Sequence, residues 1–100
     1  MDSTPDIKAL ITLTGRARVG SGYRPAHLIG TYLTTGVHQY IGRDELKMGE
    51  TLEGTITFIS PEYYPHSLGV GTKIVFQEGS RVMGYACVLE IYNEILLMRE

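Results

Sequence analysis

The sequence predicts an all-β fold, a small antiparallel six-stranded β-barrel, because about six short β-rich runs follow one another along the chain. Apolar and polar residues alternate within these runs, and glycine and proline separate them. A sustained helical period is absent from the sequence. With 100 residues, 43% of them hydrophobic, the chain has enough apolar material for one modest core and therefore for one domain.

The first four expected strands lie in the N-terminal two thirds of the chain. Residues 7–14 alternate with the period of a strand that buries one face, and residues 27–35 and 37–41 are β-rich runs on either side of Gly36. Residues 51–60 show the clearest alternation, with Leu52, Ile56 and Phe58 on one face. Gly54 within that run indicates a bulge or bend.

Two further strands are expected at residues 72–77 and from Arg81 to Tyr92, and they read as a hairpin across 78–80. The second of them is apolar on both faces. We expect its larger side chains to face the core and its small ones to let another segment or a partner approach the backbone. The larger set comprises Met83, Tyr85, Cys87, Leu89 and Ile91, and the smaller set Val82, Gly84, Ala86 and Val88.

Three regions are expected: a flexible N-terminus (1–6), the barrel (7–93) and an apolar C-terminal tail (94–100). Residues 95–98 are too apolar to leave in water, so the tail should cover barrel surface or form a homodimer. The acidic N-terminus does not resemble a secretory signal, and no apolar run reaches the roughly 18 residues of a membrane span. We therefore expect a cytoplasmic protein that does not bind membranes.

Charge is distributed unevenly although its net value is only −2. Residues 7–43 contain five basic side chains and no acid, whereas residues 44–100 contain nine acids and four bases. Such an asymmetry is typical either of a contact surface for an anion or of an ordinary solvated face. The basic residues of the first stretch are Lys8, Arg16, Arg18, Arg24 and Arg43.

Motifs for catalysis are missing. The glycine spacing of 15–20 lacks the lysine of a phosphate-binding loop, and no serine has the glycine context of a nucleophile elbow. His27, His38 and His66 lack the close spacing of metal ligands, so we expect each to be an ordinary strand or loop residue. The prediction is a non-enzymatic protein without a cofactor or metal.

Two loops are candidates for binding. The first, residues 15–25, places Arg16, Arg18, Tyr23 and Arg24 on a glycine-rich segment that suits phosphate and ribose contacts, although packing of a β-connection explains it equally well. The second, residues 60–66, carries Tyr63 and Tyr64 between prolines. Adjacent side chains cannot share one face of a strand, so one of these tyrosines is a candidate for a partner contact, against simple loop packing.

The order of several short motifs is similar to that of one known domain. Gly-Arg at 15–16, Gly-Tyr-Arg-Pro at 22–25, Ile-Ser-Pro at 59–61 and Glu-Gly-Ser-Arg-Val-Met-Gly at 78–84 follow one another as in the C-terminal domain of elongation factor Tu. The likeness extends from Ile7 to Asn93. It implies a small antiparallel β-barrel of that type, which in the family contacts aminoacyl-tRNA and the exchange factor, elongation factor Ts.

By this resemblance the tRNA-facing positions are Arg16, Thr35, Glu78 and Gly79, which keep the family's residue types. Ala17, Ala26 and Ser60 replace polar or basic residues of the family, so part of the tRNA contact is missing. The family's GTPase domain is not in this sequence, and the resemblance does not imply GTP binding.

Three functions follow as expectations. The favoured one is a non-enzymatic module that binds a protein partner, as an adaptor or a toxin-neutralising protein does. The first alternative is a translation-related module that binds tRNA. The second is a fragment or relic of a larger translation factor.

Overall fold

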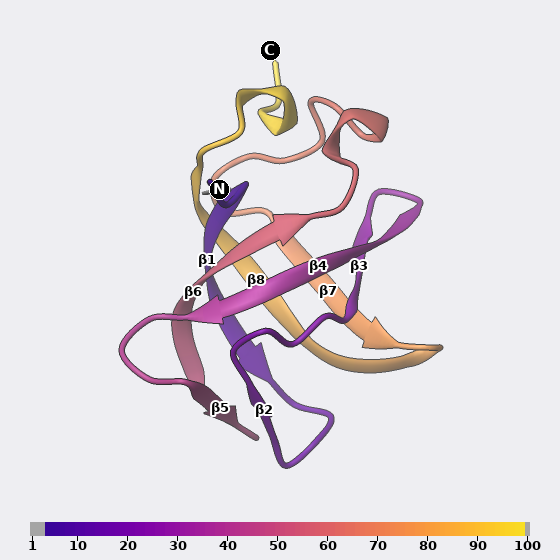
Figure 1. Cartoon of the computed structure of the whole chain (residues 1–100). Coiled ribbons are helices and arrows are strands. Elements are labelled where there is room, and N and C mark those ends of the chain that lie inside the picture. The colour runs from indigo at the N-terminus through magenta and orange to yellow at the C-terminus, as the bar shows by residue number, and fades with distance from the viewer. Residues whose placement is uncertain (1–3, 100) are drawn as a thin grey trace.

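The computed structural model describes residues 4–99, and it contains a closed barrel of antiparallel strands (Figure 1). Its neighbouring strands follow the order β1-β6-β4-β3-β7-β8, with β8 pairing back onto β1. The predicted all-β barrel of six strands is therefore confirmed. These strands are β1 (Ile7–Leu13), β3 (Ala26–Ile29), β4 (Tyr32–Tyr40), β6 (Thr51–Phe58), β7 (Lys73–Glu78) and β8 (Arg81–Ile91).

Alternation along the strands fills the barrel. In β1 every second residue from Ile7 to Leu13 is fully buried, while Lys8 and Leu10 between them face outward. In β6 the buried residues are Gly54, Ile56 and Phe58. The interior is therefore built from one face of each strand, as the period-two pattern of the sequence predicts.

Two short strands were not expected. β2 (Arg18–Gly20) and β5 (Glu45–Lys47) form a separate two-stranded antiparallel sheet at one end of the barrel (Figure 1). Each has three residues and is too short to show a period. The 3₁₀ turns η1 (Pro61–Tyr63) and η2 (Glu94–Leu96) lie together at the opposite end.

The glycine positions correct two expectations. The strand break falls at Gly30, whose φ of 61° suits the tight turn between β3 and β4, and Gly36 lies inside β4. The register of β6 also continues without a shift through Gly54 on both of its partner strands, so Gly54 marks no bulge. A Cβ at Gly54 would lie 2.8 Å from the Gln39 carbonyl oxygen, which explains the glycine by close approach instead.

The assignment of the core face of β8 from side-chain size was wrong. Gly84, Ala86 and Val88 are buried, whereas Tyr85, Cys87 and Leu89 are only partly buried. A Cβ at Gly84 would come within 2.1 Å of the Thr12 carbonyl oxygen and 2.6 Å of the Phe76 ring. Packing room therefore selects the small residues for the inner face.

The pairing of β7 with β8 has an irregularity between Phe76 and Gln77. Met83 is buried next to Gly84 in the chain, so the strict alternation is interrupted near this point. The small residues of β8 were also expected to let another segment approach the backbone, and β1 is that segment.

Both ends of the described chain are attached to the barrel. Asp6 is buried, and its carboxylate accepts hydrogen bonds from the Phe58 backbone N–H (2.7 Å) and the Asn93 side chain (2.8 Å). Ordered contacts thus begin one residue before the predicted boundary at Ile7; residues 1–3 of the predicted flexible terminus lie outside the described range. Among residues 4–99 no helix has the length and apolar character to cross a membrane.

The C-terminal tail folds back on the loop between β6 and β7. Leu96 is fully buried, its carbonyl accepts from the Leu68 N–H (2.9 Å), and the Met98 N–H donates to the Leu68 carbonyl (2.8 Å). Of the two arrangements expected for the tail, the described residues adopt the one that covers the barrel. A homodimer remains a prediction.

Candidate functional site

Three of the predicted contact residues meet at one carboxylate. Glu78 Oε2 accepts a hydrogen bond from Arg16 Nη1 at 2.7 Å and another from the Tyr23 hydroxyl at 2.6 Å. The Arg16 guanidinium also lies 5.8 Å from the centre of the Tyr23 ring. Arg16 and Tyr23 flank β2, and Glu78 ends β7, so the barrel brings together residues more than fifty positions apart.

The environment of this carboxylate favours its charged form. Hydrogen bonds from Tyr23 first, and from Arg16 second, lower the pKa of Glu78. Burial and the bond to Glu78 raise the pKa of Tyr23, which keeps its hydroxyl protonated as a donor. The three side chains form a fixed unit of one cation, one anion and one neutral donor.

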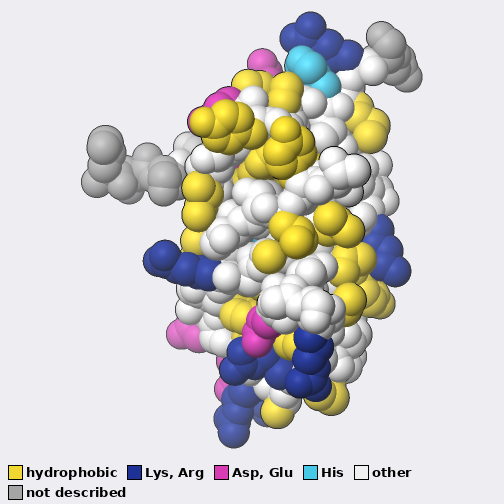
Figure 2. All heavy atoms as spheres, turned by 90° about the vertical axis from the view of Figure 1, so that its right-hand side faces the viewer, with side chains coloured by type: hydrophobic (Ala, Val, Ile, Leu, Met, Phe, Trp, Pro, Cys, Tyr) yellow, Lys and Arg dark blue, Asp and Glu magenta, His cyan; other side chains and the backbone are white. Residues whose placement is uncertain are grey.

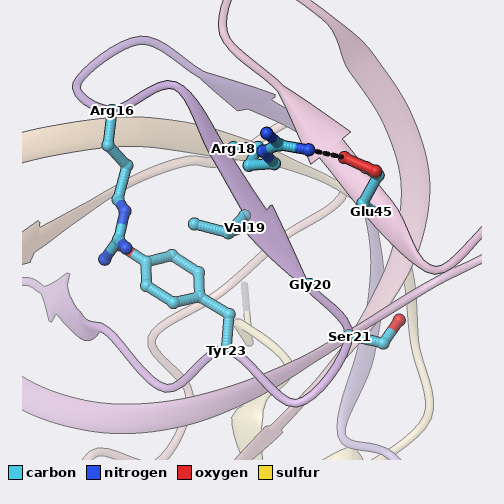
Figure 3. Close-up of a pocket in the computed structure, with 7 residues that line it drawn as sticks. All are labelled: Arg16, Arg18, Val19, Gly20, Ser21, Tyr23 and Glu45. Carbon is cyan, nitrogen blue, oxygen red and sulfur yellow. Dashed lines mark ion pairs between the residues drawn. The ribbon is translucent and has the colours of Figure 1, made fainter.

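A hollow of about 450 Å³ lies beside this unit (Figure 3). The Tyr23 ring and Arg16 stand on the side of β2 that faces away from β5, and Val19 points between them. Arg18 is 72% exposed and only loosely paired with Glu45, at 3.8 Å. The hollow is lined by Arg16, Arg18, Val19, Gly20, Ser21, Tyr23 and Glu45.

The ion pairs of the described residues explain most of the uneven charge of the sequence. Each of the four joins a basic residue of the acid-free stretch 7–43 to an acid of the stretch 44–100. Arg24 and Arg81, both exposed, form no ion pair with any residue between 4 and 99. The pairs are Lys8–Glu53, Arg16–Glu78, Arg18–Glu45 and Arg43–Glu50.

An apolar stripe crosses the outside of four neighbouring strands. Leu33 of β4 pairs with Leu28 of β3, Leu28 with Val75 of β7, and Val75 with Tyr85 of β8. Leu33 is 55% and Leu28 40% exposed, and Val75 and Tyr85 are partly exposed. We call Leu33, Leu28, Val75 and Tyr85 the outer apolar row. Sequence reasoning missed it, because it combines single residues from separate strands.

Three other predicted contact residues, Arg24, Thr35 and Gly79, form no side-chain hydrogen bond or ion pair with Arg16, Tyr23 or Glu78, which we call the arginine cluster. Thr35 faces outward on β4. It pairs with Ala26 of β3, which pairs with Gln77 of β7, and these three residues form the line next to the outer apolar row. Gly79 forms the tip of the β7–β8 hairpin. Figure 2 shows that Lys and Arg side chains gather at the lower end of this face, around an acid, with hydrophobic side chains above them.

The structure distinguishes the two adjacent tyrosines of the second loop. Tyr63 is 68% exposed, while Tyr64 is buried and lies 3.1 Å, hydroxyl to hydroxyl, from Thr34. Tyr63 is thus the one available to a partner. It belongs to η1, at the end of the barrel opposite β2, so it does not join the arginine cluster (Figure 1).

A buried histidine pair was not foreseen. The Nε2 atoms of His27 and His38 lie 2.7 Å apart, and His38 Nδ1 is 3.1 Å from the Tyr40 hydroxyl. Burial lowers the pKa of His27 to about 4 and the pKa of His38 well below its ordinary value. The two rings fall on inward positions of β3 and β4, and their pairing depends on the register of that hairpin. Within residues 4–99 no group of three potential ligands forms a metal site.

In comparisons with models of known protein families and with curated proteins, the sequence matches none. The surface geometry is therefore the basis for the function proposed below.

Proposed function

We propose that the chain is a non-enzymatic module that binds a protein partner through the outer apolar row. The observation that supports this is the adjacency of four apolar side chains on four strands, two of them at least 40% exposed. Val82, 53% exposed at the hairpin end of β8, enlarges the apolar area. A contiguous exposed apolar patch with a polar border is typical of a protein interface.

The arginine cluster supplies such a border. Arg16 and Tyr23 bind Glu78 at the end of β7, and Arg18 lines the same hollow. Arginine and tyrosine are among the residue types enriched at interface hot spots. Glu78 already occupies the donors of Arg16 and Tyr23. A phosphate would have to displace this carboxylate, whereas a protein surface of mixed charge can be accommodated beside it.

Capture from a cell lysate tests the proposal. Immobilised wild type is compared with Leu28→Glu and Leu33→Glu, which place a charge in the apolar row, and with Gln39→Glu, a matched exposed strand position outside it. A partner should be captured by wild type and by Gln39→Glu, and about tenfold less by the other two, because burying an unpaired charge costs more than about 1.4 kcal/mol. Equal capture by all four proteins would refute the proposal, provided that their unfolding transitions coincide.

Binding of tRNA is the second candidate, and it is favoured by Arg24 and Arg81, two exposed arginines that form no ion pair with any residue between 4 and 99. A titration with tRNA at two salt concentrations examines it. Affinity that falls steeply with salt, and that is lost in the double variant Arg16→Ala and Arg18→Ala, would establish phosphate contacts. Absence of binding at low salt would remove this candidate.

The proposal is compatible with the resemblance to the C-terminal domain of elongation factor Tu. The closed antiparallel barrel is compatible with it, and so is the meeting of Arg16 with Glu78, two positions that the resemblance singled out. An adaptor or toxin-neutralising role would use the same face. Identification of the captured protein separates those roles.

A further inference from the structure

Among residues 4–99, β5 is the one strand that pairs with β2, and the edge of β2 that faces the hollow has no strand beside it. The Ala17 carbonyl accepts from the Met48 N–H at 2.9 Å, and the Ser21 N–H donates to the Asp44 carbonyl at 2.7 Å. In an antiparallel ladder every second residue directs its backbone groups to the partner strand. The backbone N–H and carbonyl of Val19, midway between these two bonds, are therefore directed to β5.

The backbone groups of Arg18 and Gly20, the residues on either side of Val19, are directed away from β5. Gly20 already uses its carbonyl to accept from the Tyr23 N–H at 3.1 Å. The N–H and carbonyl of Arg18 and the N–H of Gly20 have no backbone partner among residues 4–99. Figure 3 shows Arg16 and Tyr23 on this side of β2, so the open edge borders the hollow.

The hollow itself has a clear chemical preference. Two guanidinium groups border it. That of Arg16 is already paired with Glu78 at 2.7 Å, whereas that of Arg18 is 72% exposed and only loosely paired with Glu45, at 3.8 Å. Val19 and the Tyr23 ring supply apolar surface to the lining (Figure 3). A carboxylate on a short apolar stem matches this lining, because arginine pairs with carboxylates through forked donors.

We propose that β2 accepts an extended acidic segment of the protein partner as an added strand. The segment's backbone would bond to Arg18 and Gly20, and one Asp or Glu side chain would enter the hollow and pair with Arg18, while Arg16 stays paired with Glu78. A peptide backbone offers donors and acceptors in the alternation that this edge requires, which a chain of phosphates does not. The inference rests on the proposed protein-binding function and names the kind of segment that the module binds.

The experiment begins with selection of displayed random octapeptides on the wild-type protein. The most enriched peptide is then synthesised with a fluorophore and titrated by fluorescence anisotropy. It should be rich in Asp or Glu, and reversal of its acids to Lys should weaken binding by about tenfold or more, as loss of one arginine–carboxylate pair does. N-methylation of its backbone should also abolish binding, since the added strand would lose its donors.

A matched pair of variants tests the edge directly. Gly20→Pro removes the N–H that the added strand would use, while Gly20→Ala keeps it and places its Cβ 3.6 Å from the Asp44 carbonyl oxygen, an ordinary contact. Binding should be lost in Gly20→Pro and in Arg18→Glu but kept in Gly20→Ala. Amide resonances of Arg18 and Gly20 in the wild type should shift on addition of the peptide.

Selected peptides without an excess of acid, binding that survives Gly20→Pro, or displacement of the peptide by tRNA would each overturn the inference. Failure of this inference can be distinguished from failure of the proposed function by the same capture experiment. If capture of a lysate protein is lost in Leu28→Glu but unchanged in Gly20→Pro, the apolar row binds the partner without strand addition. If no variant affects capture, both are refuted.

Discussion

At the scale of single residues, the buried histidine pair is the chemical feature that the barrel creates. A bond of 2.7 Å between two Nε2 atoms requires that one ring donates its hydrogen and that the other, neutral ring accepts it. Burial lowers the pKa of both histidines and so favours the neutral form of the donating ring as well. Both side chains are fully buried, and Phe76 packs against each of them. Protonation would introduce a charge into this interior, which burial opposes.

This pair predicts acid sensitivity. The folded-state pKa of His27 is about 4, below its ordinary 6.5, so the unfolded chain binds more protons between these values. The free energy of unfolding should therefore fall as the pH drops from about 6.5 to about 4, by roughly 3 kcal/mol from His27, with His38 acting in the same direction. Urea unfolding at pH 7, 5.5 and 4.5 measures it.

Two variants separate this effect from general acid denaturation. His27→Gln should flatten the dependence on pH, while His66→Gln, at an exposed position, should leave it unchanged. Glu50 and Glu78, whose pKa values are lowered, lose their stabilising effect only below their ordinary 4.5. Equal stability of the wild type at pH 7 and 4.5 would contradict the prediction.

At the scale of elements, short segments at the two ends of the barrel have different tasks. The β2–β5 sheet carries the arginine hollow and an open edge, whereas η2 and the following residues cover the opposite end. Leu68 and Leu97 form an isolated parallel bridge there. The tail is thus attached both by backbone hydrogen bonds and by the burial of Leu96.

Burial of one side chain should account for much of the tail's contribution. Leu96→Ala should lower the free energy of unfolding by about 2–5 kcal/mol, as expected for a fully buried leucine that leaves a cavity. Leu97→Ala, at a position 45% exposed, should cost less than about 1 kcal/mol. Denaturant unfolding of both variants provides the comparison. A similar small loss in both would mean that the tail does not stabilise the barrel.

At the scale of the whole molecule, pairs distant in sequence hold the structure closed. β1 pairs with β8 along its full length, and Asp6 bonds to Asn93 across nearly the whole chain. The four ion pairs found among residues 4–99 join the basic stretch 7–43 to the acidic stretch 44–100, over distances in sequence from seven positions (Arg43–Glu50) to 62 (Arg16–Glu78). Ion pairing within the chain thus accounts for most of the charge asymmetry, for which the sequence allowed either a solvated face or a contact surface for an anion.

This architecture predicts two levels of protection against hydrogen exchange. Amides of the six barrel strands should exchange last, because opening any of them breaks the closed ladder. Amides of β2 and β5, which form a separate sheet of three-residue strands, should exchange earlier. Native-state exchange followed by NMR measures both groups. Equal protection of the two sheets would show that they open as one unit.

The sequence by itself determined the all-β class, the barrel and the hairpin of β7 and β8, because period-two burial and turn residues are local signals. It also proposed Arg16, Tyr23 and Glu78 as contact residues. It misplaced the core face of β8, since side-chain size does not reveal that Thr12 and Phe76 leave room only for glycine at position 84.

Only the tertiary structure decided which of these residues meet. The Arg16–Glu78–Tyr23 unit, the histidine pair and the outer apolar row each combine residues from different strands. Their formation depends on strand order and register, which are properties of the closed barrel as a whole. The open edge of β2 was also decided by the tertiary structure alone. A three-residue strand shows no period in the sequence, and β2 pairs with β5 on one side because both strands lie at the end of the barrel.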